Sequence, residues 1–182
     1  MKIAQFMLFN INHDAREYVD KFFQYRMPNY LCISSDANHA YYVGLMSFRI
    51  YRNSNEMKWL DRAKQCKTLI ELWAKEGSEW NFGQKLALLQ AEELYSTGNF
   101  ESAYVSYDKA ISLARSHKFL IDEALSNELA GYCHLSAGNN AAMNYFVSAH
   151  RNYIDWGANA KATSLFHFVY EGAHKRASSW GR

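Results

Sequence analysis

Histidine and cysteine side chains are the first candidates for metal chemistry in this chain, which has seven histidines and three cysteines. The nearest cluster is Cys133-His134, and His150, His167 and His174 follow at longer intervals. Zinc sites need closely spaced cysteine and histidine pairs, and adjacent positions on a helix point to different sides. We therefore predict that His134 and His150 lie between packed helices and that the chain binds no metal.

Two pairs of adjacent carboxylates could suggest acid–base catalysis. Glu92 and Glu93 lie in the run AEEL, and Asp122 and Glu123 lie in IDEA. Neighbouring helical residues diverge by about 100°, so neither pair presents both groups to one substrate. Asp122 and Glu123 fit a first helical turn, where the helix dipole favours negative charge. The sequence also has no phosphate-binding glycine loop and no kinase catalytic motif. We predict no catalytic residue, no cofactor and no enzymatic activity.

The five tryptophans could be read as a ligand cage. Trp59, Trp73 and Trp156 fall on apolar helical faces, which favours packing over ligand binding. Trp80 falls between predicted helices and Trp180 in the tail, so these two are expected to be exposed.

The composition bounds the class of protein. The chain has 182 residues, of which 49% are hydrophobic, and this suffices for one domain with a sizeable core. The net charge of +2 gives no support to nucleic-acid binding, which needs a strong basic surface. Cys32, Cys66 and Cys133 are isolated, as in reduced cytosolic proteins. No apolar run approaches the roughly 20 residues of a membrane helix. We expect a cytoplasmic protein without a membrane partner.

Helices must position all of these residues. The chain has one proline, Pro28, and apolar residues recur at steps of three and four, the period of an amphipathic helix. We predict one helical domain over residues 1–171, a disordered basic tail over 172–182, and a possible seam only at 27–36. The predicted helices are 2–12, 14–26, 37–51, 56–76, 82–97, 100–117, 121–137, 140–155 and 158–171.

A repeat is visible when Gly98-Asn99 is aligned with Gly138-Asn139, forty residues later. Ala91 then falls on Gly131, a small residue in both copies. Glycine suits a helix end because it tolerates the left-handed backbone conformation, and asparagine caps the helix that follows. The two copies therefore predict two similar helical hairpins.

The first copy resembles a tetratricopeptide repeat, with small residues where helices cross, a Gly-Asn-aromatic turn, and then alanine, aromatic and alanine. The residues that carry the resemblance are Ala91, Gly98, Asn99, Phe100, Ala103, Tyr107 and Ala110. In the second copy, Asn140 and Met143 replace the turn aromatic and the first alanine. The resemblance implies an all-α, tetratricopeptide-like superhelical array of antiparallel helix hairpins.

A narrower resemblance covers about residues 37–165. The segments YDKAISLARSHKFLIDEALSNELAGY and YIDWGANAK look like the helical scaffold of large multi-sensor signalling kinases, which also carry ATPase-like, GAF and PAS modules. The residues in this ordered series are Ala124-Leu125, Asn127-Glu128-Leu129-Ala130, Trp156-Gly157-Ala158 and Lys161. The resemblance implies that this chain is the scaffold and not the kinase.

Tetratricopeptide arrays bind partners on the concave face, which the first helix of each hairpin lines. By that resemblance, the residues facing a groove are Lys85, Leu88, Glu92, Tyr95, Glu128 and Tyr132. This mixed surface predicts a helix of a partner protein, or a neighbouring domain, as the ligand. We expect a non-catalytic scaffold of intracellular signal transduction; the alternative is a stand-alone adaptor unrelated to kinases.

Overall fold

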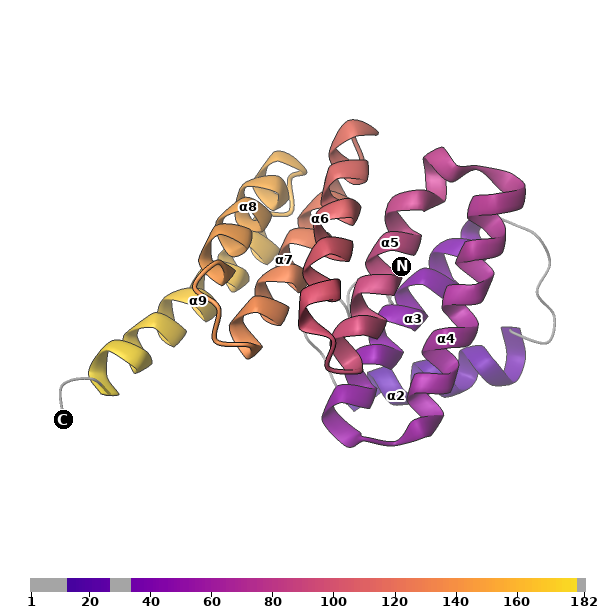
Figure 1. Cartoon of the computed structure of the whole chain (residues 1–182), viewed down its shortest axis with the longest axis horizontal. Coiled ribbons are helices and arrows are strands. Elements are labelled where there is room, and N and C mark those ends of the chain that lie inside the picture. The colour runs from indigo at the N-terminus through magenta and orange to yellow at the C-terminus, as the bar shows by residue number, and fades with distance from the viewer. Residues whose placement is uncertain (1–12, 27–33, 180–182) are drawn as a thin grey trace. The chain divides into compact units, whose positions relative to one another are not determined.

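The computed structural model of the chain describes residues 13–26 and 34–179 (Figure 1). Within these residues the chain forms eight α-helices and no strand, which confirms the predicted all-α class. The α-helices are α2 (His13–Lys21), α3 (Ser34–Ser54), α4 (Met57–Leu72), α5 (Glu79–Ser96), α6 (Phe100–Ser116), α7 (Leu120–Ser136), α8 (Ala142–Asp155) and α9 (Asn159–Ser179). π-Helical turns η1 (Phe22–Arg26) and η3 (Trp73–Gly77) continue α2 and α4.

The predicted helix 2–12 lies outside the described residues. The final helix α9 is longer than predicted, because it continues through Ser179 into the segment for which the sequence suggested disorder. None of the described helices is long and apolar enough to cross a membrane.

Two compact units make up the chain, residues 1–110 and residues 111–182. The boundary between the two units falls within α6.

In the first unit, α3 packs against both α4 and α5. Gly44 of α3 allows a close approach, because a Cβ atom there would lie 2.9 Å from Cδ2 of Leu89 and 3.0 Å from Cβ of Cys66. The repeat positions Ala91, Ala103, Tyr107 and Ala110 are all completely buried, and the Phe100 ring packs against Tyr95.

In the second unit, α7 packs against α8, and α8 packs against α9. Every residue of α7 from Asp122 to Gly131 is buried. Gly131 lies where α7 meets α8, and a Cβ atom there would be 2.7 Å from two ring carbons of Phe146. This position is the one that the repeat alignment assigned to a small residue.

The helix ends share one geometry. Gly98, Gly138 and Gly157 have φ angles of +81°, +69° and +84°. In each turn, the amide after the glycine donates to a carbonyl five residues back, as Asn99 does to Leu94, and this is the Schellman motif. The Asn99 side chain accepts a hydrogen bond from the Ser102 amide, so the predicted caps at Gly98-Asn99 are confirmed.

A further turn of this kind was not predicted, because it has no glycine. Lys118 takes the left-handed conformation, with φ +61°, and the amide of Phe119 donates to the carbonyl of Ala114. A lysine in this conformation gives no local sequence signal.

The division of the tryptophans into buried and exposed residues differs in part from the prediction. Trp59 is buried and Trp73 is half-buried against Phe82, as expected for packing. Trp156 is 47% exposed, so its assignment to a packed face was wrong. It caps the C-terminus of α8 and precedes Gly157, where the chain leaves the helix. Trp80 is exposed as predicted, but it lies in the first turn of α5. Trp180 lies outside the described residues.

Candidate functional site

Glu92 lies at the centre of a buried polar cluster in the first unit. Its Oε2 atom is 2.8 Å from Nη1 of Arg52, and its Oε1 atom accepts a hydrogen bond of 2.5 Å from the hydroxyl of Tyr107. Burial acts to lower the pKa of Arg52, but the charge of Glu92 and the neighbouring Tyr107 outweigh it and raise the pKa above its usual value. The Arg52 guanidinium also lies over the Tyr95 ring, 4.3 Å from its centre. The cluster joins α3, α5 and the part of α6 in this unit.

This arrangement changes the predicted groove in the first unit. Leu88 and Glu92 are buried, with exposed fractions of 0% and 1%, so neither side chain faces a partner. Burial follows from their place on the face of α5 that packs inside the unit. Lys85 and Tyr95 are half-buried, and the Lys85 ammonium lies 4.8 Å from the centre of the Tyr41 ring.

A similar cluster surrounds Glu128 in the second unit. Lys161 Nζ lies 2.7 Å from Glu128 Oε1, and the Tyr153 hydroxyl donates to Oε2 at 2.7 Å. The Tyr132 hydroxyl donates to Oε1 at 3.3 Å. The cluster therefore ties α7 to α8 and α9. Glu128 is also buried, so the predicted groove loses this position as well, while Tyr132 is half-buried.

Each buried carboxylate is thus paired with a cation and accepts a hydrogen bond from a tyrosine hydroxyl. Such networks position helices against one another, because a charge left unpaired in the interior is costly.

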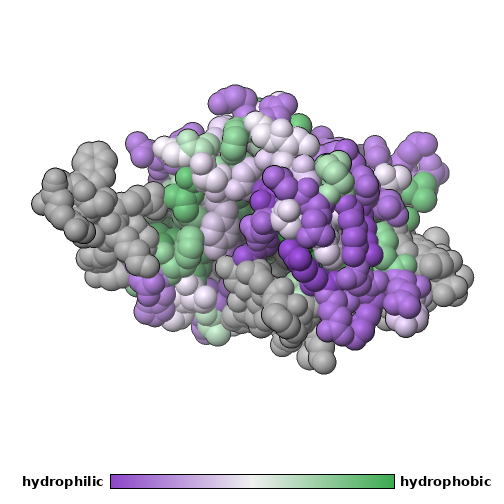
Figure 2. Space-filling model, turned by 90° about the horizontal axis from the view of Figure 1, so that it is seen from below, coloured by the Kyte–Doolittle hydropathy of each residue, from purple (hydrophilic) through white to green (hydrophobic). Residues whose placement is uncertain are grey.

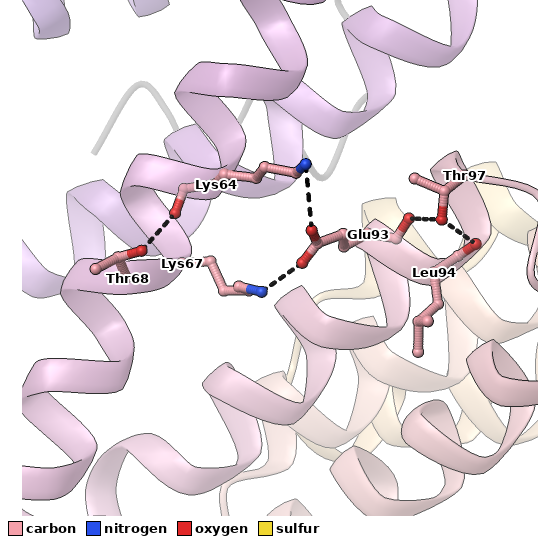
Figure 3. A network of polar contacts seen from close by, with 6 residues as sticks. All are labelled: Lys64, Lys67, Thr68, Glu93, Leu94 and Thr97. Atoms are coloured by element: carbon pink, nitrogen blue, oxygen red, sulfur yellow. Dashed lines mark hydrogen bonds and ion pairs between the residues drawn. The ribbon is translucent and has the colours of Figure 1, made fainter.

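The adjacent carboxylates diverge, as predicted. Glu92 points into the first unit. Glu93 instead faces α4, where it forms ion pairs with Lys64 and Lys67 (Figure 3). Figure 3 also shows Thr97 closing the end of α5 by donating to the carbonyls of Glu93 and Leu94. Glu93 is partly exposed, and ion pairs of this kind contribute about 0–1 kcal/mol each.

Asp122 and Glu123 lie in the first turn of α7, as predicted. Glu123 Oε1 accepts a hydrogen bond of 2.9 Å from Nε of Arg115. The helix dipole and this cation both stabilise the Glu123 carboxylate.

The histidines pack against aromatic rings. His134 is buried and stacks on Tyr145 with ring centres 4.7 Å apart, and His150 contacts Phe166. Across the described ranges, no group of three or more His, Cys, Asp or Glu residues could hold a metal ion. That the chain binds no metal or cofactor stays a prediction.

A pocket between α8 and α9 is the feature that sequence reasoning missed. Its volume is about 220 Å³, and its lining is mostly apolar. The lining residues are Phe146, Val147, His150, Arg151, Leu165, Phe166 and Val169.

Large apolar side chains are exposed on both helices that line this pocket. Met143 and Val147 of α8 are 42% and 47% exposed, and Phe166 and Phe168 of α9 are 53% and 44% exposed. In Figure 2, hydrophobic surface is visible left of centre, on the side where α8 and α9 lie in Figure 1, and smaller hydrophobic areas appear elsewhere in the view. We call this surface, together with the pocket, the α8–α9 surface.

One signal in the sequence could have indicated it. The buried face of α8 carries Ala142, Phe146, Ala149 and Tyr153. Met143 and Val147 each lie one residue later, about 100° around the helix. The apolar face of α8 is therefore wider than one packing contact requires, and the departure of Met143 from the repeat pattern marks this excess.

Within the described residues the fold is all-α, and each of the two units contains a buried ion pair between helices. The chain matches no protein-family model, no curated protein and no solved structure.

Proposed function

We propose that the chain is a non-catalytic scaffold that binds other proteins, built from tetratricopeptide-like helical hairpins. The α8–α9 surface carries this proposal. Contiguous exposed apolar surface is typical of protein-binding sites, and here it surrounds a pocket between two helices.

The hairpin geometry supports the tetratricopeptide-like arrangement. Gly98 and Gly138, forty residues apart, end α5 and α7 in the same left-handed conformation. Ala91 and Gly131, at the same spacing, are buried small residues. In helical repeats, such residues let neighbouring helices stack and leave extended faces for partners.

The Glu128–Lys161 ion pair supports the narrower proposal, that the chain acts as the scaffold segment of a multi-sensor signalling kinase. The residues that resemble that scaffold also include Trp156 and Gly157, which form the helix end between α8 and α9. A stand-alone adaptor would use the same surface. The identity of the captured partners would distinguish an adaptor from the scaffold segment of a kinase.

A pull-down with the full chain tests the proposal. We expect wild-type chain to capture at least one specific protein, and Phe166→Glu to lose it, because the substitution places a charge on the α8–α9 surface. Val105→Glu is the matched control, since Val105 of α6 is 71% exposed and distant in sequence. Identical capture by all three chains, or no capture, would contradict the proposal. Sensor or kinase modules among the captured proteins would favour the kinase context over the adaptor.

A further inference from the structure

The size of the α8–α9 pocket indicates what enters it. Small-molecule and cofactor sites are typically about 300–1,000 Å³, and this pocket has about 220 Å³. The space suits an apolar side chain inserted from a partner. Five of the seven lining residues are apolar, and His150 and Arg151 supply the polar edge.

The shape of the α8–α9 surface favours a helix as the source of that side chain. On α8, Met143, Val147 and Ile154 are exposed at spacings of four and seven residues, which place them on one face, and on α9 Phe166 and Val169 lie about one turn apart. Amphipathic helices bind such grooves through apolar residues spaced three and four positions apart.

Arg151 indicates the charge of the partner. It is exposed, it lines the pocket, and it makes no ion pair or hydrogen bond within the described part of the chain. Asp155, one turn further along α8, forms no ion pair with it. Since the lining contains no carboxylate, an acidic group brought by the partner would complement Arg151.

Two other occupants fit less well. If a second copy bound through the same surface, Arg151 and His150 of both copies would meet without a carboxylate from either lining. The chain's own segment 2–12, KIAQFMLFNIN, is apolar but carries Lys2 and no acidic residue. Neither of these two occupants supplies a carboxylate that could pair with Arg151.

We propose that the α8–α9 surface binds an amphipathic α-helix of a partner protein, which inserts an apolar side chain into the pocket and pairs a carboxylate with Arg151. This inference rests on the proposed scaffold function and names the partner class for it.

Two synthetic helical peptides of about four turns test the inference by fluorescence anisotropy with the full chain. Both carry the same leucine stripe at positions i, i+3, i+4 and i+7; one has flanking glutamates and the other has lysines. We expect the acidic peptide to bind several-fold more tightly, and the difference to shrink with added salt. Arg151→Glu should reverse the preference, and Phe166→Glu or Phe166→Ala should weaken both peptides. Val105→Glu should change neither affinity. Circular dichroism checks that each variant is folded.

Equal affinities in wild type, tighter binding of the lysine peptide, or no binding of the acidic peptide would overturn the inference. A wild-type dimer that Phe166→Glu converts to a monomer would also overturn it, because a second copy would then occupy the surface. If the peptides fail while the pull-down still depends on Phe166, only the partner class is wrong. If the pull-down also captures nothing, the scaffold function itself fails.

Discussion

Lys161 and Glu128 form an ion pair whose side chains are only 6% and 5% exposed. Lys161→Met should lower the free energy of unfolding by about 3–5 kcal/mol, because it leaves the buried carboxylate without its cation. Lys161→Met combined with Glu128→Gln should recover most of this loss, since the neutral amide needs no cation and still meets the Tyr153 hydroxyl. Urea denaturation of the two variants and wild type measures both effects. A double variant no more stable than Lys161→Met would show that lost packing, and not the unpaired charge, causes the loss.

Asp20 of α2 pairs with Lys58 and Arg62 of α4, with N–O distances of 2.9 and 2.5 Å. Burial acts to raise the pKa of Asp20, but the hydrogen bonds and charges of Lys58 and Arg62 outweigh it and lower the pKa below 3.8. A lowered carboxyl pKa stabilises the fold above the ordinary pKa, and this stability is lost as the pH falls through the folded value.

Asp20→Asn should therefore lower the Tm at pH 7, and the difference from wild type should begin to shrink as the pH falls below about 4 and should vanish once the pH is below the lowered pKa of Asp20. The side chain is 44% exposed, so solvent screening limits the effect to about 1 kcal/mol or less. Asp61→Asn, which removes an exposed carboxylate from α4, is the control and should change the Tm less. Melting curves of wild type and both variants across this pH range measure the effect. A Tm difference between wild type and Asp20→Asn that persists at low pH would show that the ion pairs are not its source.

At the scale of elements, the contact between α7 and α8 depends on Gly131. Alanine favours a helix by about 1 kcal/mol over glycine, but overpacking costs about 1–3 kcal/mol. The Phe146 ring that the new Cβ would meet is packed between Tyr132 and Phe168, with ring centres 5.2 and 6.2 Å away. The cost of overpacking should therefore exceed the gain in helix propensity.

Gly131→Ala should therefore destabilise the chain by about 1–2 kcal/mol in urea unfolding. Adding Phe146→Leu, which makes room, should reduce the cost of the alanine. Gly77→Ala is the matched control: its nearest neighbour is 3.9 Å away, so it should be neutral or stabilising. Equal effects at Gly131 and Gly77 would rule out the close contact.

At the end of α6, introducing a glycine should stabilise the chain. Lys118 adopts a left-handed conformation that costs about 1–2 kcal/mol for residues other than glycine. Lys118→Gly removes this strain but adds freedom to the unfolded chain, so the Tm should rise slightly. Gly98→Ala, at the corresponding turn after α5, should lower the Tm. A lower Tm for Lys118→Gly would mean that the lysine side chain stabilises the turn.

Across the whole molecule, the sequence predicts what local patterns encode. The period of three and four residues located the helices, and Gly98 and Gly138 located two of their ends. Lys118 ends a helix without a glycine, so its turn left no signal. The Glu128–Lys161 pair joins residues 33 positions apart, which periodicity cannot detect. Leu88, Glu92 and Glu128 are buried and do not line the predicted groove. That groove was inferred from a resemblance, and a resemblance in a local pattern does not reveal which side chains this chain buries.

The division into residues 1–110 and 111–182 leads to a prediction for the whole chain. In helical repeats, stability is the sum of local units and the interfaces between neighbours, so a local defect need not loosen every unit equally. In native-state hydrogen exchange, Lys161→Met should accelerate exchange in α7, α8 and α9, which the Glu128 cluster joins. Amides of α3, α4 and α5, which pack within the first unit, should keep most of their protection. A uniform rise along the chain would show that the two units unfold as one cooperative structure, and the Glu128 cluster would then stabilise the entire fold.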